Sequence, residues 1–198
     1  DFLVDVALAQ DRRIAAVFAG EPVAAHGTGV TWVRNSLMQN LDEPMDAIIT
    51  TGGGYPLDMT YYQCLKGITA AGNMIRPGGR ILMAGACDEG VGSPEFSEMM
   101  LRFPKDSDFM RGIEGVPVTV DQWQLEKLAL VSRETEVLYL APGVPENFQK
   151  VFWGRACTSA QDAVNSLLAG LSPSARIAIV PEGPYVLAQA SGAVSTSQ

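Results

Sequence analysis

From residue 45 onward, the apolar residues come in short unbroken runs, and segments with helical spacing lie between them. The apolar runs are residues 45–51, 80–86, 136–140 and 176–180. Such runs are typical of strands that are covered on both faces, as in a parallel sheet. Helical signals occupy residues 58–71, 93–103, 105–112, 119–133 and 159–169. We expect Asp58 to cap the first of these helices, and residues 77–79 to form a turn before the strand that follows it. This alternation predicts an α/β fold, with a mostly parallel, Rossmann-like sheet flanked by helices on both faces.

The first forty residues follow a different pattern. Residues 2–9 and 13–19 are strand-like runs separated by a turn at 10–12, which predicts a β-hairpin. Residues 22–40 have helical spacing and begin with a proline, which is favoured in a first helical turn. We therefore expect three parts, namely the end of a preceding N-terminal domain, a C-terminal α/β domain and a flexible tail. Their bounds are 1–40, 41–187 and 188–198.

Each predicted strand from residue 45 onward runs into a loop that contains glycine or proline. Because ligands of open α/β sheets bind beyond the carboxyl ends of the strands, these loops are the expected site. The first of them, Thr51-Gly52-Gly53-Gly54-Tyr55-Pro56, lies between a strand and a helix, as a phosphate-binding loop does. It matches neither the GxGxxG pattern nor the P-loop pattern. The glycines are consistent with a close approach to a ligand and equally with a tight turn.

Three side chains near these loops are candidates for binding. Gln63 and Lys66 are three residues apart on a predicted helix and therefore share one face. Together they can offer an amide and a cation to one carboxylate, although an ordinary solvated pair is the alternative. Trp123, near the start of a later helix, fits a pocket wall or a core position.

The composition of the chain excludes several classes of protein. With 47% hydrophobic residues and 18% charged residues, the chain is neither disordered nor a coiled coil. A net charge of −8 without a basic stripe argues against nucleic acid as a partner, and no apolar run is long enough to span a membrane. The single histidine, His26, cannot complete a Ser/His/Asp triad or a histidine-based metal site within this chain. We expect Cys64, Cys87 and Cys157 to be buried free thiols in a cytoplasmic protein, with a redox or metal-binding role as the alternative.

A longer motif resembles a known family. Gly53-Gly54-Tyr55-Pro56-Leu57-Asp58, followed by Tyr62-Gln63-Cys64-Leu65-Lys66-Gly67, resembles the C-terminal part of the nickel-pincer-dependent lactate racemases and their 2-hydroxyacid racemase relatives. Further matching segments follow in the family's order as far as about residue 187, namely Gly78 to Met83, Asp88 to Gly90, Asp121 to Trp123 and Ile177 to Gly183. The chain departs from the family at Gly52 and at Met59-Thr60, where more polar residues are usual.

The resemblance implies a two-domain isomerase, a racemase or epimerase, whose active site lies between the domains. Its cofactor, a nickel-pincer nucleotide tethered to a lysine of the N-terminal domain, takes a hydride from the α-carbon of the substrate and returns it to either face. Histidines of that domain act as bases. For this chain, the resemblance implies catalytic roles for Gln63 and Lys66. It implies substrate-binding roles for Trp123, Tyr55, Gly53 and Gly54.

These implications set the expected partners. They are a small 2-hydroxy acid and the N-terminal domain, which would precede Asp1, without nucleic acid or membrane. We expect no metal or cofactor on this chain alone, and we expect the isolated chain to be inactive. The alternative is a non-catalytic α/β module that binds a small ligand or a nucleotide. An upstream lysine motif and paired histidines in the same reading frame would favour the enzyme.

Overall fold

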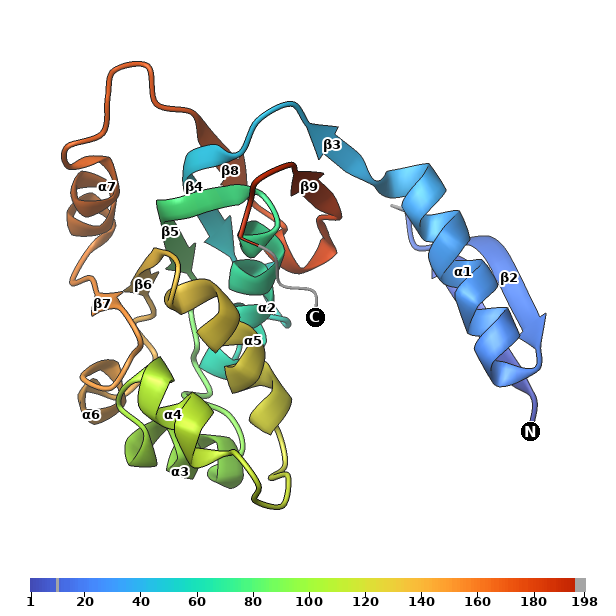
Figure 1. Cartoon of the computed structure of the whole chain (residues 1–198), viewed down its shortest axis with the longest axis horizontal. Helices are drawn as coiled ribbons and strands as arrows, with labels where there is room; N and C mark the ends of the chain where they lie inside the picture. The colour runs from blue at the N-terminus through green and yellow to red at the C-terminus, as the bar shows by residue number, and fades with distance from the viewer. Residues whose placement is uncertain (10, 195–198) are drawn as a thin grey trace. The chain divides into compact units, whose positions relative to one another are not determined.

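The computed structural model describes residues 1–9 and 11–194, and the chain divides into two compact units, residues 1–40 and 41–198. In the smaller unit, β1 (Leu3–Leu8) and β2 (Ile14–Gly20) form an antiparallel hairpin, on which α1 (Pro22–Leu37) packs (Figure 1). The predicted hairpin and helix are confirmed, although Gln10 of the predicted turn lies outside the described residues. A short strand, β3 (Gln39–Leu41), follows α1.

A five-stranded parallel sheet forms the larger unit, and its strand order is β7-β6-β5-β4-β8. The strands are β4 (Met45–Thr51), β5 (Ile75–Ala84), β6 (Glu136–Leu140), β7 (Arg155–Ala156) and β8 (Ile177–Val180). The predicted parallel sheet is therefore confirmed. None of the helices in the described part of the chain combines the length and the apolar character that crossing a bilayer requires.

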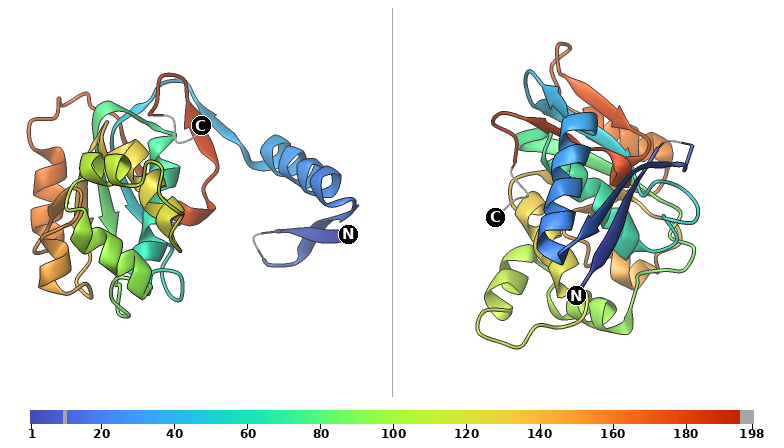
Figure 2. Two further views of the ribbon diagram at one scale, coloured as in Figure 1. Left: turned by 60° about the horizontal axis from the view of Figure 1, so that its bottom comes forward. Right: turned by 90° about the vertical axis from the view of Figure 1, so that its right-hand side faces the viewer.

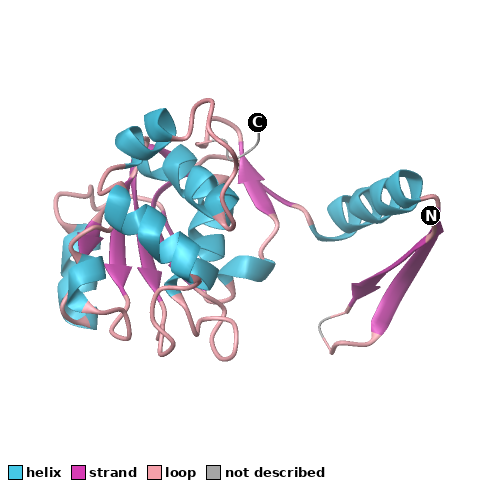
Figure 3. Ribbon diagram, turned by 90° about the horizontal axis from the view of Figure 1, so that it is seen from below, coloured by secondary structure: helices cyan, strands magenta, loops and turns pink. Residues whose placement is uncertain are grey.

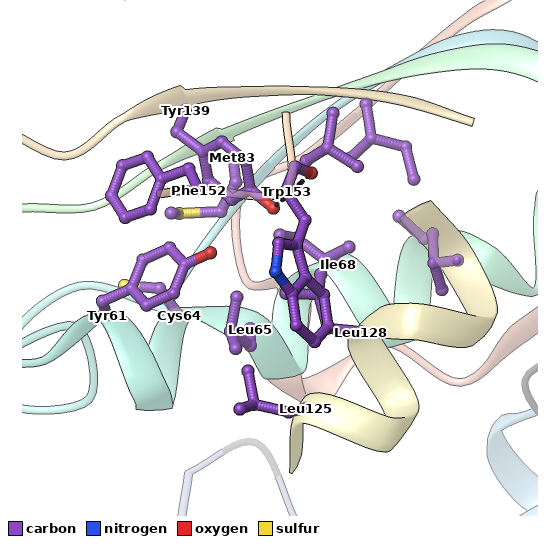
Figure 4. Close-up of a cluster of buried hydrophobic side chains, with 14 of the residues drawn as sticks. Tyr61, Cys64, Leu65, Ile68, Met83, Leu125, Leu128, Tyr139, Phe152 and Trp153 are labelled. Carbon is purple, nitrogen blue, oxygen red and sulfur yellow. Dashed lines mark hydrogen bonds between the residues drawn. The ribbon is translucent and has the colours of Figure 1, made fainter. Parts of the chain in front are cut away.

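Helices cover both faces of the sheet, but unequally. The helices are α2 (Tyr61–Gly72), α3 (Pro94–Arg102), α4 (Asp106–Gly112), α5 (Gln122–Ser132), α6 (Glu146–Gln149) and α7 (Ala160–Leu168). A large core includes buried side chains of α2, α3, α4 and α5, whereas α7 covers a smaller cluster on the opposite face (Figures 1 and 2). Figure 4 shows part of the large core, where Tyr61 and Leu65 of α2 lie between the sheet and Leu125 of α5.

The start of α2 differs from the prediction. Asp58 was expected to cap this helix, but the helix begins at Tyr61, where the Thr60 hydroxyl accepts the Gln63 N–H at 3.3 Å. The Asp58 carboxylate instead accepts the Ala86 N–H at 3.1 Å. A capping oxygen was therefore correctly expected near this position, but it comes from a different residue.

The start of β5 also differs from the prediction. Residues 77–79 were expected to form a turn before a strand at 80–86, but they lie inside β5. Met45 of β4 pairs with Ile75 and Ala47 pairs with Arg80, so the extra residues of β5 bulge out of the register. Gly78 takes a φ of 72° in this bulge, a conformation that glycine adopts without steric cost.

The C-terminal residues are held in place as far as residue 194, although a flexible tail was expected over 188–198. After the 3₁₀ turn η1 (Gly183–Tyr185) comes β9 (Ala188–Ala190). The Ala190 N–H donates to the Asn73 carbonyl at 2.9 Å, and the Val194 N–H donates to the Ile75 carbonyl at 2.8 Å. Val194 is also buried, so apolar contact holds this segment together with its hydrogen bonds. The remaining residues of the expected tail, 195–198, lie outside the described residues.

Candidate active site at the carboxyl edge of the sheet

The loops that follow β4, β5, β6 and β8 meet at one edge of the sheet, because these strands are parallel (Figure 3). Hydrogen bonds join neighbouring loops. The Thr51 hydroxyl donates to the Pro181 carbonyl at 2.5 Å, and the Gly143 N–H donates to the Ala86 carbonyl at 2.9 Å. The carboxyl edge is therefore a connected set of loops, in the position where an open α/β sheet binds its ligand.

The glycines after β4 shape the turn that leads to α2. Gly53 and Gly54 have φ values of 90° and 70°, which a residue with a side chain adopts only at a steric cost. The Gly54 carbonyl accepts the N–H groups of Leu57 and Asp58 and closes the turn. Gly52 is buried, and a Cβ there would lie 2.6 Å from the Cys64 sulfur. Packing therefore explains the glycine at position 52, where the family resemblance led us to expect a polar residue.

The first turn of α2 has already used its backbone donors. The Tyr61 N–H donates to the Gly90 carbonyl at 2.9 Å, and the Tyr62 N–H donates to the Val91 carbonyl at 2.9 Å. The next donor, the Gln63 N–H, bonds to Thr60. These N–H groups are thus unavailable to an anionic ligand, which a helix start otherwise binds. Recognition of an anion at the start of α2 therefore depends on side chains.

Gln63 and Lys66 lie on successive turns of α2, as predicted from their spacing. Gln63 is half-buried and Lys66 is exposed. Within residues 1–9 and 11–194, the Lys66 ammonium forms no ion pair and the Gln63 amide side chain forms no hydrogen bond. Both polar groups are therefore available to a ligand. Their roles toward substrate and cofactor stay predictions.

The remaining predicted site residues lie on the loops around α2. Tyr55 is 85% exposed on the turn after β4, beside Gly53 and Gly54. Trp123, in the first turn of α5, is 51% exposed, so the alternative of a core position is excluded. Its ring meets that of Tyr62 edge-on, with centroids 6.3 Å apart and planes at 87°. This contact connects Trp123 to the helix that carries Gln63 and Lys66.

Two further residues of this region were not found from the sequence. Asp121 has a φ of 64° immediately before α5, and its carboxylate accepts the Ser93 hydroxyl at 2.7 Å. Burial, followed by the Asp121 carboxylate, raises the pKa of Tyr62, so this phenol stays protonated near neutral pH. Tyr62 thus interacts with both Asp121 and Trp123. Tyr62 and Asp121 are 59 residues apart in the chain, and no local pattern connects them.

The donor set of the described residues suits an anion better than a metal. In the part of the chain that the structure describes, no three His, Cys, Asp or Glu side chains lie close enough together to hold a metal ion. His26 belongs to the smaller unit, where its Nδ1 is 3.3 Å from the Asp5 carboxylate. The Lys66 ammonium, in contrast, has three N–H donors and a positive charge, which suit an anionic ligand.

The comparisons with known proteins agree on one family. The family described as lactate racemase C-terminal domain matches residues 41–188. The chain is 27% identical over 190 residues to the lactate racemase of Lactiplantibacillus plantarum and 28% identical over 189 residues to that of Thermoanaerobacterium thermosaccharolyticum. Each match covers 94% of this chain but 44% of the relative, so the chain spans less than half the length of these curated relatives.

Solved structures agree with this match. The lactate racemase apoprotein from Thermoanaerobacterium thermosaccharolyticum superposes with a TM-score of 0.81 at 26% identity, covering 95% of this chain and 46% of that structure. A protein from Thermotoga maritima has a TM-score of 0.61 at 12% identity over 96% of this chain and 49% of its own, which shows a shared fold alone. Because the family match extends over most of its length, the chain belongs to the lactate racemase C-terminal domain family.

Proposed function

We propose that this chain supplies one side of the active site of a lactate racemase-like isomerase that acts on a small 2-hydroxy acid. The relatives that match the chain are named lactate racemase, which supports the reaction class. The observation that carries the proposal is the Lys66 cation at the carboxyl edge of the sheet, which is exposed and forms no ion pair with the residues that the structure describes. In a chain of net charge −8, such a cation is well suited to recognise a small anion.

Lys66 binds the carboxylate of the hydroxy acid or an anionic group of the cofactor. Both enantiomers of a 2-hydroxy acid carry the same carboxylate, so one cation serves both directions of racemisation. Gln63, one turn earlier, offers donors and an acceptor that orient the bound anion and its hydroxyl group. Holding these groups leaves the α-carbon as the centre whose configuration changes.

Trp123, Tyr55, Gly53 and Gly54 form the border of the bound substrate. The Trp123 ring excludes water from the reacting centre, and its contact with Tyr62 holds the ring in place. The two glycines allow the backbone to approach a ligand without interference from side chains. Tyr55 is exposed on the same turn and adds an aromatic ring with a hydroxyl group to this border.

The nickel-pincer nucleotide of the family fits this scheme as a group held mainly by another domain. When bound, it supplies the hydride chemistry at the α-carbon. The described residues of this chain provide no cluster of metal ligands, so we assign to the chain only contacts with anionic parts of the cofactor through Lys66 and Gln63. We place the cofactor-bearing domain in the part of the relatives that this chain does not cover.

Lactate racemisation by the complete enzyme, in which the chain is joined to the domain that its relatives carry, tests the proposal. The isolated chain is expected to be inactive and to bind no stoichiometric nickel, which elemental analysis checks. Loss of a hydrogen bond to a charged group costs about 1.5–3 kcal/mol, so Lys66→Ala should lower kcat/KM by roughly 10- to 150-fold. Gln63→Ala should lower it less, because its hydrogen bonds carry no charge on the protein side.

Lys150→Ala is the matched control, since Lys150 is a surface lysine that pairs with Glu146 on α6. It should retain the kcat/KM of the unmodified enzyme. Lys66→Arg should recover part of the lost activity, because it keeps the charge while changing its geometry. Circular dichroism checks that every variant is folded. Unchanged kinetics in folded Lys66→Ala and Gln63→Ala would contradict the assigned site.

A further inference from the structure

Two cysteine sulfurs meet in the core beneath the carboxyl edge. Cys64 lies in α2 and Cys87 lies in the loop after β5, and their Sγ atoms are 3.7 Å apart. Both residues are fully buried, and Figure 4 shows Cys64 beside Tyr61 on α2. We propose that Cys64 and Cys87 are a redox-active dithiol pair, which closes to an intramolecular disulfide on reaction with a small-molecule disulfide such as oxidised glutathione.

Backbone hydrogen bonds hold the two cysteine residues close to each other. The Cys87 N–H donates to the Asp58 carbonyl at 2.8 Å, and the Cys64 N–H donates to the Thr60 carbonyl at 3.2 Å. The present distance is that of a hydrogen bond between the two thiols, and the sulfurs must approach by about 1.7 Å to reach the length of a disulfide bond. Rotation about a Cα–Cβ bond moves the attached sulfur by distances of this size.

Glycines surround the Cys64 sulfur. A Cβ at Gly52 would lie 2.6 Å from it, and a Cβ at Gly85 would also collide with it. The absence of these side chains leaves the sulfur in contact with Cys87 rather than separated from it. Cys157, the third free thiol, belongs to the other apolar cluster, across the sheet under α7. The chain therefore contains one pair of neighbouring thiols and a single thiol that serves as an internal control.

The exchange proceeds in two balanced steps. In the first step, the Cys87 thiolate attacks the small disulfide, forms a mixed disulfide and releases one small thiolate. In the second step, the Cys64 thiolate attacks the Cys87 sulfur, so the Cys64–Cys87 bond forms and the second small thiolate leaves. The protein pair loses two electrons and two protons, and the small disulfide becomes two thiols.

The order of the steps follows from the surroundings of each residue. The hydrogen bond with the Cys87 thiol, together with burial, raises the pKa of Cys64, which makes it the slower nucleophile. Cys87 lies in a loop, and local opening of this loop gives the oxidant access to its sulfur.

The product cross-links the helix that carries Gln63 and Lys66 to the loop after β5. The inference is independent of the proposed racemase activity.

Peptide mapping of the whole 198-residue chain tests the inference. The protein is incubated with oxidised glutathione, the remaining thiols are alkylated, and the digest is analysed by mass spectrometry. We expect a linked pair of peptides containing Cys64 and Cys87, lighter by two hydrogen atoms than the reduced pair and separated by dithiothreitol. Cys157 should be recovered in alkylated form or as a glutathione adduct, and never in the linked pair.

Variants make the assignment specific. Cys157→Ala should still form the linked peptides, whereas Cys87→Ala should form none. If Cys87→Ala fails to fold, the wild-type map decides, because it requires no variant. The incubation is continued until the peptide map no longer changes. The proposal would be overturned if Cys64 and Cys87 were then recovered only as alkylated thiols or only as separate glutathione adducts.

Discussion

Asp58 joins two loops of the carboxyl edge through its side chain and its backbone. Its carboxylate accepts the Ala86 N–H at 3.1 Å, and its carbonyl accepts the Cys87 N–H at 2.8 Å. Asp58 ends the turn after β4, whereas both donors follow β5. One residue therefore sets the spacing of two loops that border α2.

Replacing Asp58 should destabilise the larger unit. Asp58→Ala removes the acceptor of the part-buried Ala86 N–H, and loss of a typical hydrogen bond costs about 0.5–1.5 kcal/mol. We expect the free energy of unfolding in urea to fall by this amount. Asp88→Ala is the control, because the Asp88 side chain is exposed in the neighbouring loop. Equal stability of the two variants would contradict the role given to Asp58.

We expect Asp46 to make the free energy of unfolding depend on pH in the acid range. Its Oδ1 accepts the Arg76 Nε–H at 2.7 Å and its Oδ2 accepts the Arg176 N–H at 2.8 Å, and these bonds lower the pKa of the carboxyl group. Because the folded pKa lies below the unfolded value of about 3.9, the stabilisation is complete above that value and is lost as pH falls through the folded pKa.

Unfolding measured from about pH 5 down to about pH 3 tests this linkage. In Asp46→Asn, the free energy of unfolding should be lower than in the wild type at the upper end of the range. It should also decline less steeply with acid, since the variant has no carboxylate to protonate. Asp88→Asn should follow the wild-type curve in shape. Parallel curves for Asp46→Asn and the wild type would show that these hydrogen bonds contribute nothing to acid sensitivity.

At the scale of single residues, the sequence predicts which side chains could bind a ligand better than it predicts which residues those side chains contact. The spacing of Gln63 and Lys66 could be interpreted directly, because a helix places residues three apart on one face. The contact of Tyr62 with Trp123 could not be predicted, because it requires the packing of α2 against α5. Asp58 was misassigned for the same reason, since its partner at Ala86 is 28 residues away.

At the scale of elements, α2 approaches the end of β4 closely because glycines lie between them. A Cβ at Gly67 would collide with the Thr51 carbonyl. Gly183 of η1 is equally close to this carbonyl, and a Cβ there would lie 2.9 Å from the Gly67 Cα. These glycines let α2 and η1 pack against the carboxyl end of the strand. Close packing therefore explains why the residue after Lys66, Gly67, is a glycine.

Gly67→Ala should therefore destabilise the larger unit although alanine favours helices. Overpacking against backbone costs about 1–3 kcal/mol, more than the gain of about 0.5–1 kcal/mol from replacing glycine inside a helix. Gly27→Ala in α1 is the comparison, because nothing lies within 4 Å of its added Cβ. Thermal unfolding should show a lower midpoint for Gly67→Ala and no loss for Gly27→Ala. A Gly67→Ala midpoint at or above that of the wild type would exclude the close contact.

The elements that could be predicted are those whose signals are local. Ser93 and Ser159 precede α3 and α7, and each accepts a backbone N–H of its helix, at 3.2 Å and 3.1 Å. The buried strands of the sheet appear as apolar runs for a similarly local reason. Strand β7 has two residues and β9 has three, so their identity depends on partner strands and no sequence pattern marks them.

At the scale of the whole molecule, the hairpin of residues 1–40 has apolar residues on both faces. Phe18 packs on α1, with its ring 6.0 Å from that of Trp32. The other face exposes Val4, Val6, Leu8 and Val17, and Val6 pairs directly with Val17. Contiguous exposed apolar patches often mark interaction surfaces. Under the proposed function, a further domain of the complete enzyme would cover this face, because the curated relatives are more than twice as long as the part that matches.

An opposite-charge pair on this face should act differently in the two contexts. Val6→Lys combined with Val17→Glu places a lysine opposite a glutamate, a pairing that antiparallel strands tolerate. In the isolated chain, the double variant should keep its circular dichroism spectrum and bind less of a dye that reports exposed apolar surface. In the complete enzyme, it should lower the yield of folded protein, because the charges would be buried against the other domain. Glu98→Lys, an exposed substitution on α3, should change neither. A complete enzyme that tolerates the double variant as well as it tolerates Glu98→Lys would show that this face stays open to solvent.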